Sequence, residues 1–314
     1  MWRCLLVPLA FGCLAAVPAD AQQAGDLHVD YQMIAAGLHV ADATADFGLG
    51  PWSYQVRLAY HTTGLIGFFY QGHQEVTVTG SWAENGPVPH EFLGEGVWRG
   101  QRRATVIDYH HGEPLIRTLE PPNEADREPV PANLRANTVD TLSALAELVR
   151  TVTRSGSCEA TVHTFDGRTA TLLSAHTVGV ETLAPTGRSA FHGPALRCDF
   201  QSRVLAGFLS DASEQARQRP LHGSAWFASV VPGAGPLPVR LTVVTRWFGD
   251  ATLYLTDAGY LTGASDQGVP GADPSGGSAS AGGASAGSSA RASAGISVNA
   301  AAVAAAPAAI AGVP

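Results

Sequence analysis

The chain has 314 residues, with 27 acidic residues against 19 basic ones and a formal net charge of −8. Because nucleic-acid-binding surfaces are basic, this charge argues against nucleic acid as a partner. No lysine occurs in the chain. Its sequence therefore excludes a Schiff-base lysine, a phosphate-loop lysine and a Ser-Lys catalytic pair.

The first 21 residues have the three-part layout of a secretion signal. Arg3 supplies a minimal positive start, Leu5–Val17 is apolar, and Ala19-Asp20-Ala21 forms a small-x-small cleavage site. A transmembrane anchor is the alternative, but the apolar stretch is shorter than the roughly 20 residues that cross a bilayer. We therefore expect residues 1–21 to be removed and the mature protein to be exported to a bacterial periplasm, with no membrane-spanning segment left.

Between residues 22 and 262, apolar and polar residues alternate with a period of two in several segments. This alternation is typical of strands with one face toward a core and the other toward water. Glycine-containing turns separate the segments, and Asp166-Gly167 is the strongest hairpin signal. Connections this short join antiparallel neighbours. The sequence predicts one all-β domain over 22–262, a mainly antiparallel sheet whose clearest strands are 27–33, 54–60, 76–82, 196–204 and 239–247.

One segment breaks the period of two. Asp140 or Thr138 is placed to cap a first helical turn. Apolar residues then recur at intervals of three and four, namely Leu142, Leu145, Leu148, Val149 and Val152. This spacing predicts a single confident helix over Asp140–Thr153, packed on the sheet through its apolar stripe. A second, short helix is compatible with residues 211–218.

The mature chain keeps two cysteines, because the other two belong to the predicted signal. In an oxidising compartment an even pair is most simply a disulfide. Alternation places both Cys158 and Cys198 on apolar strand faces. The alternative, a nucleophilic cysteine assisted by His163 or His176, needs an exposed thiolate. We predict a disulfide between Cys158 and Cys198.

Residues 263–314 are dominated by glycine, serine and alanine. Such a segment buries too little apolar surface to offset the entropy lost on ordering. The composition predicts a disordered C-terminal tail. A tail that spaces the domain from a surface or a partner is the functional alternative.

No catalytic motif stands out in the predicted domain. It contains no Gly-x-Ser-x-Gly elbow, and no phosphate-binding or dinucleotide fingerprint follows a predicted strand. His110-His111 lies in a predicted hairpin, where adjacent side chains point to opposite faces and cannot share a metal ion without a bulge. We predict no catalytic residue, no metal and no cofactor. Enzymatic activity stays open, with a non-enzymatic role favoured.

The segment Gly64–Tyr70 is unusually apolar for its position after a strand. Its large side chains either pack in the core, or line an apolar cleft or touch lipid. The residues named as candidate contacts with an apolar ligand are Leu65, Ile66, Phe68, Phe69 and Tyr70.

The order and spacing of several short landmarks resemble the exported bacterial family of domain of unknown function 3108, over residues 25–256. The landmarks include Tyr31, Ala36-Gly37-Leu38, Asp140 to Ala144, Cys158, Phe165 to Arg168, Gly193 to Cys198 and Pro238 to Arg240. One departure is Thr141, where a proline is expected at the first helical position. The family has no established activity, so no catalytic residue is carried over. The resemblance implies an envelope location and a curved, half-barrel-like architecture similar to periplasmic lipoprotein carriers.

Three functions remain open at this point. We favour a non-enzymatic periplasmic protein whose curved sheet, crossed by the helix, binds an apolar envelope ligand such as a lipid, or an envelope protein. The alternatives are a structural or assembly factor that acts through its surface and tail, and an unrecognised hydrolase.

Signal removal predicts that the exported protein begins at or near Gln22. The intact mass of protein recovered from the periplasm checks this start point. A mature protein that still carried Leu5–Val17 would contradict the secretion argument.

Overall fold

The computed structural model describes residues 25–69, 71–123, 127–244 and 249–261. The helices of this part are α1 (Gly64–Phe69), η2 (Ala132–Leu134), α2 (Thr141–Ser155) and α3 (Glu214–Gln218). The strands are β1 (Leu27–Ala35), β2 (Leu38–Leu49), β3 (Ser53–Thr62), β4 (Gly72–Ala83), β5 (Gly86–Trp98), β6 (Gln101–His110), β7 (Glu113–Glu120), β8 (Ala160–Phe165), β9 (Ala170–Leu183), β10 (Gly193–Ala206), β11 (Leu221–Ala228), β12 (Leu237–Val244) and β13 (Asp250–Tyr260).

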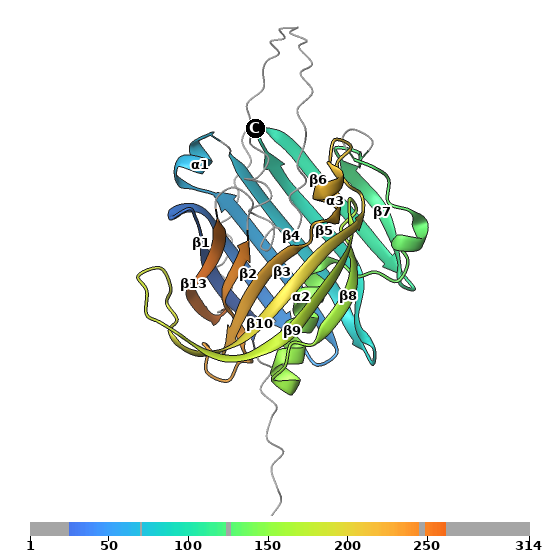
Figure 1. Cartoon of the computed structure of the whole chain (residues 1–314). Coiled ribbons are helices and arrows are strands. Elements are labelled where there is room, and N and C mark those ends of the chain that lie inside the picture. Colours follow the sequence, from blue (N-terminus) through green and yellow to red (C-terminus); the bar gives the residue numbers. More distant parts are fainter. Residues whose placement is uncertain (1–24, 70, 124–126, 245–248, 262–314) are drawn as a thin grey trace, which may run out of the picture.

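The strands described form one 13-stranded sheet in the order β7-β6-β5-β4-β3-β2-β1-β13-β12-β11-β10-β9-β8. Every pairing in this order is antiparallel, and the sheet curls into a nearly closed barrel with α2 inside (Figure 1). The predicted curved antiparallel sheet with one packed helix is confirmed. Residues 1–21 and 263–314, predicted as signal and tail, lie outside the described residues.

Each strand predicted from alternation is present, although Trp247 at the end of the last one lies outside the described residues. The hairpin between β1 and β2 turns at Ala36 and Gly37, which have φ angles of 49° and 81°. Two positive φ angles in succession match the right-handed twist of the flanking strands. Inward-facing residues such as Val29, Val56 and Val78 are fully buried, so the alternation correctly identified the core faces.

Helix α2 begins and ends close to the predicted bounds. Asp140 is its N-cap and accepts a hydrogen bond from the Ser143 backbone N–H, while Gly156 ends the helix in the left-handed conformation. The helix contacts β2, β3, β4, β5 and β8. Short α3 falls within the segment where a second helix was compatible with the sequence.

A buried chain of hydrogen bonds joins the start of α2 to β3. The Ser143 hydroxyl donates to Asp140 Oδ2 at 2.5 Å, and Ser143 Oγ lies 2.7 Å from the Tyr54 hydroxyl oxygen. All three side chains are buried. Burial disfavours the charged carboxylate and raises the pKa of Asp140 to about 6, although the bonds from Ser143 act in the opposite direction. The cap therefore also anchors the helix to the barrel wall.

No strand ladder joins the barrel edges β7 and β8 in the described residues. Backbone hydrogen bonds between Val139 and β8, together with side chains of the turn after β8, close the gap. In the turn after β8, Asp166 Oδ1 accepts from the backbone N–H groups of Arg168 and Thr169, both at 2.7 Å. Arg168 reaches across and donates to the Glu120 carbonyl at the end of β7 at 2.8 Å. Because the Arg168 side chain is buried, this contact seals the seam of the barrel.

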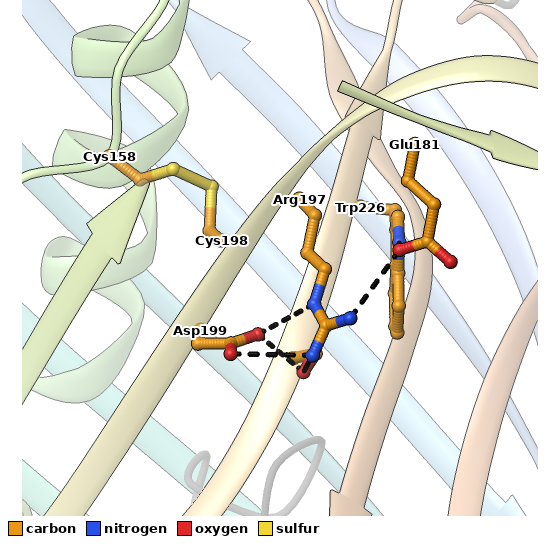
Figure 2. A network of polar contacts seen from close by, with 7 residues as sticks. Cys158, Glu181, Arg197, Cys198, Asp199 and Trp226 are labelled. Atoms are coloured by element: carbon orange, nitrogen blue, oxygen red, sulfur yellow. Dashed lines mark hydrogen bonds and ion pairs between the residues drawn. A yellow bond between two sulfur atoms is a disulfide. The ribbon is translucent and has the colours of Figure 1, made fainter. Parts of the chain in front are cut away.

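The predicted disulfide is present. Cys158, just before β8, and Cys198, in β10, have Cα atoms 6.0 Å apart, within the usual range for a bridge. Both are buried, and Figure 2 shows the bond beside α2. The nucleophilic-cysteine alternative is wrong, because neither sulfur is a free thiol.

Replacing both Cys158 and Cys198 with alanine should lower the free energy of unfolding by roughly 2–5 kcal/mol, the usual cost of losing a native bridge. Urea denaturation of the oxidised protein and of the variant measures the difference. Wild type treated with a reductant is the control and should unfold like the variant. Equal midpoints for oxidised wild type and variant would contradict a stabilising bridge.

The Asp140 carboxyl predicts a pH dependence of stability. The pKa of Asp140 is about 6 in the folded protein and 3.8 in a solvated carboxyl, so the unfolded state ionises first as pH rises. The contribution of the protonated Asp140 carboxyl to the free energy of unfolding is complete below about pH 4 and is lost by about pH 6. The free energy of unfolding changes by up to about 3 kcal/mol over this range.

The Asp140→Asn variant keeps a good N-cap and cannot ionise. Denaturant unfolding of both proteins from pH 4 to pH 7 should show wild type losing stability relative to the variant as pH rises. Parallel stability curves would disprove the assignment.

Candidate functional site

An apolar cavity lies inside the barrel, between α2 and the wall formed by β8 to β12. Its volume is about 160 Å³, comparable to a cavity that takes up a benzene molecule. Further lining comes from β1, β2, β3 and β13. The side chains that shape it most are Leu145 and Leu148 of α2 and, on the opposite wall, Phe200, Leu221 and Leu241.

The spacing of residues along α2 explains why the helix leaves this space. Leu142, Ala146 and Val149 form a fully buried stripe. Leu145 and Leu148 lie on the neighbouring stripe and are only partly buried. The sequence placed these leucines in one apolar stripe packed on the sheet, whereas in the structure they face the cavity. Their partial exposure makes them available to a ligand.

The opposite wall follows from alternation in β8 to β12. Inward-facing residues of these strands meet in the cavity, and several of them are small, such as Ala160, Ala175 and Ala225. The Phe200 ring packs directly over Gly223, and a Cβ atom at position 223 would overlap that ring. Small inward residues thus leave room that large ones would fill.

The lining offers hydrocarbon and almost no polar chemistry. Its polar side chains are Tyr31, Thr141, Ser174 and Ser202, and none of the residues described as lining it is charged. The Tyr31 hydroxyl donates to the Pro238 carbonyl at 2.8 Å. The hydroxyl proton of Tyr31 is thus already donated, and the lining that remains is mainly hydrocarbon, which suits an apolar ligand.

The disulfide borders the cavity. Cys158 precedes the lining residue Ala160 by two positions, and Cys198 precedes Phe200 by two positions. Side chains two residues apart in a strand share a face. The bridge therefore braces the wall next to the cavity by tying the start of β8 to β10.

The segment predicted to contact an apolar ligand lies elsewhere. Residues 64–69 form α1 at one end of the barrel (Figure 1), and Phe68 and Phe69 are not among the residues that line the cavity. Phe68 and Phe69 are 79% and 69% exposed and form an edge-to-face pair, so these two do not pack in the core. Leu65 and Ile66 belong to the same helix, and Tyr70 lies outside the described residues. Ligand contact by this segment stays a prediction.

A polar network on the outer face of β9, β10 and β11 was not expected from the sequence. Figure 2 shows Arg197 between two carboxylates: its Nε donates to Asp199 at 2.8 Å, and an Nη lies 3.5 Å from Glu181. Ser224 donates to Asp199, and the Trp226 indole donates to Glu181. The Ser224 hydroxyl meets a carboxylate directly, without an intervening histidine. His176, the cross-strand neighbour of Asp199, lines the same hollow as Ser224. The network ties β9, β10 and β11 together.

The histidines form no metal site in the described residues, where no group of three or more metal-ligating side chains comes together. His111 occupies the turn between β6 and β7 with a φ of 51°. Within the same part of the chain, no helix has the length and apolar character needed to cross a membrane.

Comparison with known proteins identifies the family to which this chain belongs. No curated protein matches the chain. Among solved structures, the chain is similar to a beta-barrel-like protein of domain of unknown function DUF1849 from Brucella abortus, with a TM-score of 0.45 and 8% identity over 75% of this chain and 98% of that one. A family model described as protein of unknown function (DUF3108) matches residues 29–256. The chain therefore belongs to the DUF3108 family of proteins of unknown function.

Proposed function

We propose that this protein binds a small apolar ligand, or the hydrocarbon chain of an amphiphile, in the cavity inside its barrel. The observation that carries the proposal is a cavity lined by apolar side chains that are only partly buried. Leu145 and Leu148 face Phe200, Leu221 and Leu241 across a space of about 160 Å³. In a protein without an established ligand, a well-formed apolar cavity is the first place to look for the binding site.

The affinity expected for a hydrocarbon chain follows from the free energy of moving that chain from water into the cavity. Each buried CH₂ group contributes about 0.8 kcal/mol. A chain of about eight carbons therefore gains up to roughly 6 kcal/mol before the entropic cost of binding is subtracted. Without that cost the gain would correspond to a Kd of tens of micromolar, so binding in the millimolar range is the expected strength for such a probe.

The secretion signal supports a location for this activity. Its layout predicts export to the periplasm, a compartment bounded by lipid on both sides. Shielding a hydrocarbon chain from water is a useful task there. We therefore propose an envelope lipid, or a fragment of one, as the natural ligand class.

The cavity favours this function over hydrolysis. The buried carboxyl of Asp140 caps α2, and it is not among the residues that line the cavity.

The exposed edge of β9 supports a second candidate function, the binding of another protein. Strand β8 pairs with β9 only as far as Ala175, and beyond that point Val178 and Val180 are exposed. Exposed edges of this kind accept added strands.

Filling the cavity tests the proposal. Ala144 lines it from α2, and Ala144→Phe should weaken binding of 1-octanol by about tenfold, or 1.4 kcal/mol. Calorimetry or ligand-detected NMR with the exported protein measures the affinity.

Ala59→Phe is the matched control. Ala59 lies between the inward-facing Leu58 and Tyr60 in β3, so its side chain points away from the cavity, and the variant should bind 1-octanol like wild type. A wild-type protein that does not bind 1-octanol, or an Ala144→Phe variant that binds it equally well, would reject the cavity and favour the β9 edge.

A further inference from the structure

We propose that the ligand is an anionic amphiphile with a single hydrocarbon chain, and that Arg219 binds its headgroup at the mouth of the cavity. This inference rests on the proposed function and adds the charge of the ligand and the residue that selects it.

We place the mouth of the cavity at Leu221. This residue lines the cavity and also a depression of about 130 Å³ on the barrel rim. The depression is completed by Arg219, Pro220, His222 and Val244. The apolar interior and the polar rim thus meet at Leu221.

The backbone places Arg219 beside this opening. Arg219 follows α3 and has extended angles, with φ −89° and ψ 114°. Residues two apart on an extended chain project to the same side, so Arg219 and Leu221 leave the backbone on the same side. A chain seated against Leu221 therefore has its polar end within reach of the guanidinium.

Among the residues that the structure describes, none compensates the charge of Arg219. Nearby Arg217 donates two hydrogen bonds to Glu128, at 2.8 and 2.7 Å. Arg219 is exposed and makes no hydrogen bond or ion pair with any residue that the structure describes. Asp250 pairs with Val244 at the same rim, yet it makes no ion pair with Arg219. A guanidinium fork binds carboxylate or phosphate through two hydrogen bonds.

The interior dictates the orientation of the ligand. Burying an unpaired anion costs far more than burying hydrocarbon, and no charged side chain lines the described cavity. The anionic group must therefore stay at the rim while the chain enters. Arg219 is the cation that the rim supplies among the residues lining the depression.

The test compares three probes with the same eight-carbon chain: 1-octanol, octanoate and octyl phosphate. Arg219→Gln should weaken binding of both anions by about fivefold, as expected for an exposed charge-assisted contact. Its affinity for 1-octanol should stay unchanged. In wild type, anion affinity should fall as salt is raised, because salt screens exposed charges.

Arg203→Gln is the matched control. Arg203 is exposed, and it follows the cavity-lining Ser202 in β10, so it projects from the outer face. This variant should bind all three probes like wild type. Tighter binding of octyl phosphate identifies phosphate as the headgroup, whereas tighter binding of octanoate identifies carboxylate.

Three outcomes would overturn the inference. If Arg219→Gln binds both anions as wild type does, while 1-octanol also binds, the headgroup assignment fails and the proposed function stands. If the variant loses all three probes by the same factor, Arg219 acts on the fold and not on the headgroup. If no probe binds to wild type, the proposed function fails as well.

Discussion

The position of α2 inside the barrel depends on the buried hydrogen bonds of Asp140. The carboxyl caps the helix through Ser143, and Ser143 in turn contacts Tyr54 of β3. This contact holds one stripe of the helix against the wall formed by β2 to β5. The other stripe then faces β8 to β12 across a gap. Without this anchor, α2 could move toward the centre of the barrel and its leucines could fill the cavity.

Two further contacts keep the opposite wall in place. Arg168 ties the turn after β8 to the end of β7, and the disulfide ties the residue before β8 to β10. The short edge strand β8 is thus held at both ends. Because β8 contributes Ala160 and Val162 to the cavity, these contacts also preserve the shape of the site.

The polarity of the site is divided between its interior and its rim. The interior contains leucine, phenylalanine and alanine, and the rim carries Arg219. This division is the basis on which we propose a ligand with one apolar and one anionic end. The exposed phenylalanines of α1 belong to the surface of the barrel and add a second apolar feature outside the cavity.

Local patterns in the sequence predicted five of the thirteen strands, the helix with a cap at Asp140 or Thr138, the cysteine pair and the family. Each of these depends on neighbouring residues or on spacing along the chain. Tertiary structure alone decided that Leu145 and Leu148 face a gap, that Phe68 and Phe69 are exposed, and that Arg219 and Leu221 line one depression on the rim. Alternation tells which face of a strand points inward, but not how far apart the opposite walls stand. That distance is set by contacts between residues remote in sequence, such as Tyr54 with Ser143 and Cys158 with Cys198.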